Sequence, residues 1–254
     1  MVAITSPSNG GTPGRCRFHQ DNALLARSHI IPEVLYKHSY DDGHKAIVLY
    51  PETWKQAKAQ QGYRQPLLCH WCERYFNEEF EKPFQAQWID SGAIPDDVPA
   101  MEPLVVPIDY RTFKLFHLSV LWRASVSTLP AFQRVKLGPH EEKIRAMLIS
   151  GDPGPSTAYP IAGFLLHLNG QIAKDNIVCH SPARYDGHRA VFAVYGGCLW
   201  VTFVSYSIPD WARSFLIREE GPARLYMLPL TGLSFVKELM KHLPFLERGS
   251  GRPT

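Results

Sequence analysis

The chain of 254 residues is long enough for one large domain or two small ones, and its 45% apolar and 20% charged content is that of a globular protein. These values exclude a disordered or fibrous chain. The formal net charge of +3 excludes a polybasic tail as the main contact with nucleic acid or membrane, although it permits a local basic cleft.

The distribution of proline and glycine predicts how the chain is divided. Residues 1–14 are polar and rich in Gly and Pro, which predicts a flexible lead-in without the character of a signal peptide. Residues 91–109 contain four prolines, which predicts an extended linker. We therefore expect one domain at residues 15–90 and a second at residues 110–254.

The cysteines indicate a reducing compartment. No signal peptide and no apolar run of membrane-spanning length is recognised, so we expect a cytoplasmic protein with no membrane partner. The five cysteines are odd in number and clustered, which argues against a disulfide framework. Cys179 and Cys198 lie in apolar, strand-like surroundings and are interpreted as small core residues.

Two short segments of the first domain have the spacing of metal ligands. Cys16 and His19 are separated by two residues, and so are Cys69 and Cys72. Such spacing lets a tight turn point both side chains at one ion, and two such turns supply the four ligands of tetrahedral Zn²⁺. We therefore predict a structural zinc site; the alternative is a set of buried cysteines beside surface histidines.

Further polar residues lie between and after these pairs. His29 is expected at the end of a strand, just before the chain turns, where it is a candidate catalytic group or simply a histidine bonded to backbone. A short helix is expected over residues 73–81. Glu73 and Asn77 are four residues apart on that helix, so they share one face and could hold a second ion; the alternative is a solvated helix face.

The order of these motifs resembles that of the HNH nucleases, whose ββα-metal fold is stapled by a structural zinc. The resemblance covers residues 15 to about 82. The chain also resembles a bacterial HNH-like group through three motifs: SHIIP at Ser28 to Pro32, LLCHWCE at Leu67 to Glu73 and LFHLSVLWRAS at Leu115 to Ser125.

The resemblance implies a specific chemistry. His29 would be the general base that activates a water against a phosphodiester, and Glu73 and Asn77 would be catalytic ligands of Mg²⁺ or Mn²⁺. Two departures leave an alternative open. Ser28 stands where many members have an Asp ligand, and His19 replaces a more usual cysteine, so the chain could instead be a catalytically inactive, zinc-stapled module that binds nucleic acid or protein.

A nuclease of this kind needs cations near its cleft to contact phosphate groups. The candidates are Arg27, Lys55, Lys58 and Arg74, with ordinary solvated side chains as the alternative. Lys55 and Lys58 are expected on a short helix in an insertion that could form one wall of a substrate groove. By analogy we expect DNA rather than RNA as the substrate, in a bacterial restriction-like or antiviral role.

The second domain is predicted to be α+β and to recognise a protein partner or a nucleic-acid feature. Residues 110–130 predict a largely buried helix that Pro130 ends, and a second helix is expected from Pro139 to about Ile149. Strands are expected around a turn at Asn169-Gly170 and in a hairpin around Gly196-Gly197. A last helix at residues 232–243 should cover this antiparallel sheet, so the whole chain is assigned to the α+β class.

Overall fold

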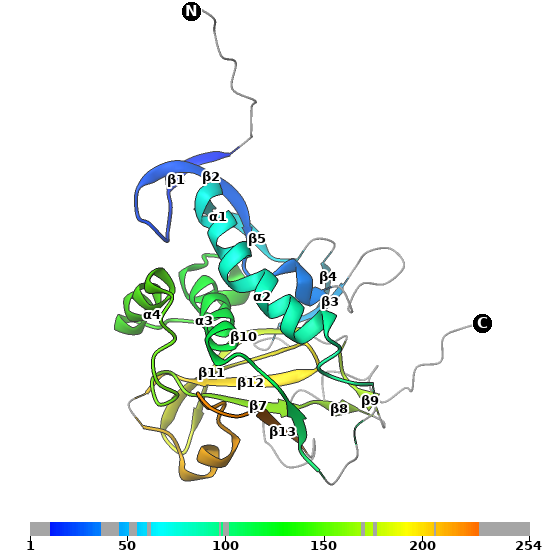
Figure 1. Cartoon of the computed structure of the whole chain (residues 1–254). Helices are drawn as coiled ribbons and strands as arrows, with labels where there is room; N and C mark the ends of the chain where they lie inside the picture. Colours follow the sequence, from blue (N-terminus) through cyan, green and yellow to red (C-terminus); the bar gives the residue numbers. More distant parts are fainter. Residues whose placement is uncertain are drawn as a thin grey trace, which may run out of the picture.

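The fold is described by a computed structural model, and it is α+β as the sequence predicts (Figure 1). The structure describes residues 11–36, 46–50, 55–59, 62–96, 98, 102–168, 171–174, 177–205 and 207–228. Residues 1–10, the predicted turn at Asn169-Gly170 and the predicted helix at residues 232–243 lie outside this part of the chain. The division of the chain into two domains stays a prediction.

The N-terminal unit is a small antiparallel sheet followed by a helix. Its strands lie in the order β1-β2-β5. Its elements are β1 (Thr12–Arg15), β2 (Asn22–His29), β5 (Arg64–Cys69) and α1 (His70–Phe76). β1 begins within the segment that composition assigns to the lead-in, because its backbone pairs with β2 from Thr12 onward. β2 ends at His29, as expected.

The helix after the second cysteine pair is longer than the sequence indicates. It continues from α1 through three further segments to Asp90: η2 (Asn77–Glu81), α2 (Lys82–Phe84) and η3 (Gln85–Asp90). η2 and η3 have the wider π-helical hydrogen bonding, and the Lys82 N–H donates to the Asn77 carbonyl. Pro83 lacks an N–H and cannot complete an α-helical ladder, which accounts for the irregular winding around it.

Two further helices follow. α3 (Tyr110–Val126) is buried on nearly all sides, as the breadth of its apolar face predicts. It ends at Val126 rather than at Pro130, because Ser127 is extended and its hydroxyl donates to the Gln65 side chain. α4 (Pro139–Ser150) begins at the predicted proline and ends one residue beyond the predicted end.

The large sheet has eight strands among the described residues, in the order β4-β3-β10-β11-β12-β7-β13-β6. Their bounds are β3 (Ala46–Tyr50), β4 (Lys55–Ala59), β6 (Leu104–Val106), β7 (Ile161–Leu165), β10 (Ile177–Tyr185), β11 (His188–Tyr195), β12 (Cys198–Phe203) and β13 (Ala223–Met227). A separate pair is formed by β8 (His167–Leu168) and β9 (Gln171–Ile172). The sheet is mainly antiparallel, and only β10 with β3 and β13 with β7 run parallel.

The expected hairpin at Gly196-Gly197 is confirmed. Tyr195 pairs directly with Cys198, and both glycines have positive φ, which a two-residue turn between antiparallel strands requires. The short helix expected around Lys55 and Lys58 is wrong. Lys55–Ala59 is strand β4, which pairs along its whole length with β3, so tertiary pairing overrides the local helical preference.

Helix α3 lies between the N-terminal unit and the large sheet (Figure 1). On one side, Phe116 stacks on Phe84 with ring centroids 3.6 Å apart. On the other side, Phe113 contacts Trp200 of β12 at 5.3 Å. The opposite face of the sheet packs on η5 (Asp210–Phe215), whose Ala212 is fully buried. α3 therefore joins the N-terminal unit and the sheet through one continuous core.

Candidate metal centre and the adjoining cleft

The four predicted zinc ligands come together in one cluster. The ligand atoms of Cys16, His19, Cys69 and Cys72 all lie within 4.8 Å of one another. His19 Nδ1 is 3.2 Å from the Cys72 sulfur and 3.6 Å from the Cys69 sulfur. Ligand bonds of about 2.0–2.3 Å in a tetrahedron place neighbouring ligand atoms about 3.5–3.8 Å apart, so the donor set fits Zn²⁺.

Two turns hold this cluster. The Cys16 carbonyl accepts a hydrogen bond from the Gln20 amide at 2.9 Å, which closes the turn between β1 and β2. Cys69 ends β5 and caps α1, with its sulfur accepting from the Cys72 amide at 3.5 Å. The Cys69 amide in turn donates to the Cys16 sulfur at 3.4 Å. Backbone N–H groups thus already support negative charge on two of the sulfurs.

The electrostatics of the cluster also favour a bound cation. A hydrogen bond with Cys72 lowers the pKa of the Cys16 thiol to about 4, against the opposing effect of burial. The same contact and the burial raise the pKa of the Cys72 thiol. Negative charge on one of these sulfurs therefore disfavours negative charge on the other. A dication removes this conflict, because it stabilises all the thiolates together.

The candidate catalytic residues line one cleft beside this cluster. His29, Glu73 and Asn77 all contribute to the wall of a cleft of about 640 Å³. His29 comes from the end of β2, whereas Glu73 and Asn77 lie one turn apart where α1 passes into η2. The cleft is rich in carboxylates, because Glu33, Glu78 and Glu81 line it together with Glu73.

Glu73 is a half-buried residue in the first turn of α1. Burial raises its pKa, while a hydrogen bond from Ser28 and the charge of Arg123 partly oppose that rise. Its Oε1 atom is buried and has no hydrogen-bond partner among the described residues. Ser28 is fully buried, and its hydroxyl also accepts from the Leu68 amide at 3.0 Å, so the serine joins the two strands to the helix.

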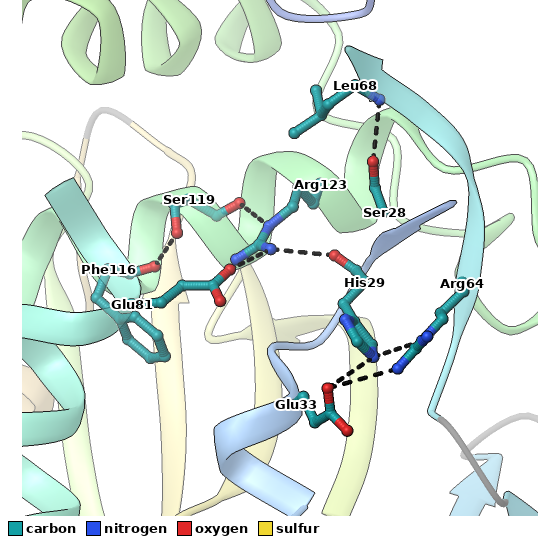
Figure 2. A network of polar contacts seen from close by, with 9 residues as sticks. All are labelled: Ser28, His29, Glu33, Arg64, Leu68, Glu81, Phe116, Ser119 and Arg123. Carbon is teal, nitrogen blue, oxygen red and sulfur yellow. Dashed lines mark hydrogen bonds and ion pairs between the residues drawn. The ribbon is translucent and has the colours of Figure 1, made fainter. Parts of the chain in front are cut away.

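A polar network that the sequence analysis missed surrounds His29, as Figure 2 shows. Arg64 Nε donates to His29 Nε2 at 2.6 Å, and Glu33 lies 3.8 Å from the same ring nitrogen. Arg123 Nη1 donates to the His29 carbonyl at 3.0 Å and forms an ion pair of 2.7 Å with Glu81. The available signal was Arg123 itself, a charged side chain in the last turn of a helix that is otherwise largely buried.

The structure describes the side chains of two of the four predicted contacts with nucleic acid. Arg74 lines the cleft and Arg27 is exposed on β2. The backbone places Lys55 and Lys58 on β4, and their side chains lie outside the described part of the structure.

Within the described ranges, groups of three or more His, Cys, Asp or Glu side chains close enough for one ion are confined to the four-residue cluster. None of the helices described is both long and apolar enough to cross a membrane. Comparisons with models of protein families, with curated proteins and with solved structures find no match to this chain.

Proposed function

We propose that the chain is a metal-dependent endonuclease of the HNH type that hydrolyses phosphodiester bonds, with DNA as its substrate. The observation that carries this proposal is the shared cleft of His29, Glu73 and Asn77 beside a cluster suited to Zn²⁺. A general base and oxygen ligands for a hard cation are the groups that metal-assisted phosphodiester hydrolysis requires.

His29 is oriented for the role of general base. Because Arg64 Nε donates to Nε2, that ring nitrogen carries a lone pair and not a proton. Arg123 holds the backbone carbonyl of the same residue, which restrains the strand end from which the ring projects. Once Arg64 moves away from Nε2, an unprotonated imidazole of this kind can take a proton from the attacking water.

The carboxylates of the cleft support dependence on a metal ion. Glu73 presents a buried oxygen without a partner among the described residues, and Asn77 adds an amide oxygen one helical turn away. Carboxylate and amide oxygens are the ligands that Mg²⁺ and Mn²⁺ prefer, and the ion would supply Lewis-acid stabilisation of the phosphate charge. Without a cation, the four carboxylates of the cleft would repel a phosphodiester.

One observation favours the second candidate, a zinc-stapled binding module without catalysis. Ser28 is buried and bonded to Leu68, so it supplies no charged ligand to the cleft. In addition, His29 Nε2 is already occupied by Arg64, which must move before the ring can take a proton from water.

Cleavage of plasmid DNA separates the two candidates. Wild type is incubated with Mg²⁺, with Mn²⁺ or without added metal, alongside His29→Ala and the control His167→Ala from β8. We expect metal-dependent nicking that falls about 10²–10⁴-fold in His29→Ala, the usual contribution of a general base. His167→Ala should cleave like wild type.

Zinc content and circular dichroism verify that both variants are folded. If folded, zinc-loaded wild type binds DNA but never cleaves it with either metal, the binding module is the correct function. Equal cleavage by His29→Ala and wild type would remove His29 from the mechanism.

A further inference from the structure

A second concave site lies on the large sheet, apart from the carboxylate-rich cleft. It is a groove of about 350 Å³ between the β10–β11 hairpin and the segment that leads into α4. Arg184 and Arg189 come from the hairpin, and Arg134 and Lys136 come from the segment before α4. We call these four residues and the small apolar side chains between them the basic groove.

Among the residues that the structure describes, no acidic side chain pairs with the cations of the basic groove. No carboxylate lines it, and within the described residues no ion pair includes any of its four cations. Arg184 instead donates to the Gly187 carbonyl at 3.2 Å, and Arg189 donates to the Lys136 carbonyl at 3.1 Å. These contacts orient the guanidinium groups and leave their charge uncompensated.

Two of these cations occupy directly opposed positions on neighbouring strands. Arg184 pairs with Arg189 in the antiparallel register of β10 and β11. Like charges at directly opposed positions destabilise a sheet. An anion bound between the two guanidinium groups would turn this repulsion into attraction, because arginine pairs bidentately with phosphate.

We propose that the basic groove binds the sugar-phosphate backbone of nucleic acid. This inference rests on the proposed function, and it answers a need of that function, because four glutamates line the cleft and a phosphate backbone must be held by cations elsewhere. Four cations on two chain segments can contact consecutive phosphates without reading sequence. A concave groove fits a strand, whereas the flat surface of an anionic membrane would reach it poorly.

The test measures binding without cleavage. Fluorescence anisotropy of labelled single-stranded and duplex DNA is recorded with full-length, zinc-loaded protein, without added Mg²⁺ or Mn²⁺, at several NaCl concentrations. The variants are Arg184→Gln/Arg189→Gln and Arg134→Gln/Lys136→Gln. The control Arg213→Gln/Arg224→Gln removes the same charge from exposed positions outside the groove.

We expect each groove variant to bind duplex DNA at least about tenfold more weakly, with a salt dependence shallower by about 2 in log–log slope. The control should retain most of the affinity. The Arg184/Arg189 variant should melt no lower than wild type, since it relieves a like-charge pair. If one groove variant does not fold, the other provides the same comparison.

Binding unchanged in both folded groove variants would overturn the inference, and so would wild type that binds anionic vesicles but not nucleic acid. Since no catalytic metal is present, weakened binding in the groove variants supports the inference even if the cleavage assay shows no nuclease. A groove variant that binds DNA weakly but still cleaves it at saturating concentration would support the inference, because it has lost binding and not catalysis.

Discussion

Arg123 connects three parts of the molecule through one buried side chain. It projects from α3, where its side chain is 1% exposed, and it contacts the end of β2 and Glu81 of η2. Its guanidinium also lies over the Phe76 ring, with the central carbon 5.2 Å from the ring centroid. Burying a guanidinium is costly unless its charge is compensated, and Glu81 supplies that compensation.

A double-mutant cycle measures this coupling. Arg123→Met introduces an apolar side chain of similar length and leaves Glu81 without its partner. We therefore expect a loss of about 3 kcal/mol in the free energy of unfolding. Glu81→Gln removes the other charge. The double variant should lose less than the sum of the two single losses, as measured by urea unfolding. Strict additivity with small losses would show that the pair does not stabilise the fold.

At the scale of elements, the N-terminal unit is a small three-stranded sheet followed by a helix. β1, β2, β5 and α1 meet at the cysteine-histidine cluster, where the turn after β1 faces the first turn of α1. A small unit of this kind gains stability from a structural metal, because its ligands assemble only in the folded state. The cluster also fixes the first turn of α1, which carries Glu73 into the cleft.

Replacing one ligand should therefore affect both the metal and the unit. We expect wild type to contain about one Zn²⁺ per chain by elemental analysis, and Cys69→Ser to contain much less and to melt at a lower temperature. The matched control is Cys198→Ser, which alters a fully buried cysteine on β12. It should keep its zinc. Full zinc content in Cys69→Ser would contradict the assignment of the cluster.

At the scale of the whole molecule, α3 is packed against the large sheet through a layer that contains buried polar groups. His117 of α3 and Tyr195 of β11 share a hydrogen bond of 2.6 Å. His180 of β10 lies beside the same tyrosine, with ring centroids 6.1 Å apart. Burial lowers the pKa of His180 to about 3, and the charge of Arg123 lowers it further. Burial also lowers the pKa of His117, as does His180.

These histidines make the stability of the fold dependent on pH. Both stay neutral in the folded state, whereas the unfolded chain takes up protons near pH 6.5. Their contribution is therefore complete above about pH 6.5 and is lost as the pH falls toward the folded pKa of His180, about 3. Each histidine adds a slope of up to about 1.4 kcal/mol per pH unit within that window.

The contribution is isolated by comparing wild type with His180→Gln, which cannot be protonated in this range. The free energy of unfolding is measured with urea between about pH 7.5 and pH 4.5. As the pH falls, wild type should lose stability relative to His180→Gln. A difference that does not change with pH would mean that His180 is not held neutral in the folded state.

Much of this protein follows from local sequence. The spacing of Cys16 with His19 and of Cys69 with Cys72 predicts the cluster, because a tight turn joins ligands two residues apart wherever the turn lies in the fold. Gly196-Gly197 predicts its hairpin for a similar reason, since few other residues adopt positive φ at both turn positions. The α+β class and the start of α4 were likewise evident from local pattern.

Only the tertiary structure decided which distant residues meet. Lys55–Ala59 is a strand because it pairs with β3, and β3 in turn pairs with β10, which is distant in the sequence. Arg123, Arg64 and Glu81 gathered around His29 because α3, β5 and η2 pack there, and no spacing along the chain encodes that meeting. Turns and ligand pairs depend on neighbours in sequence, whereas strand partners and buried charge pairs depend on which surfaces the core brings together.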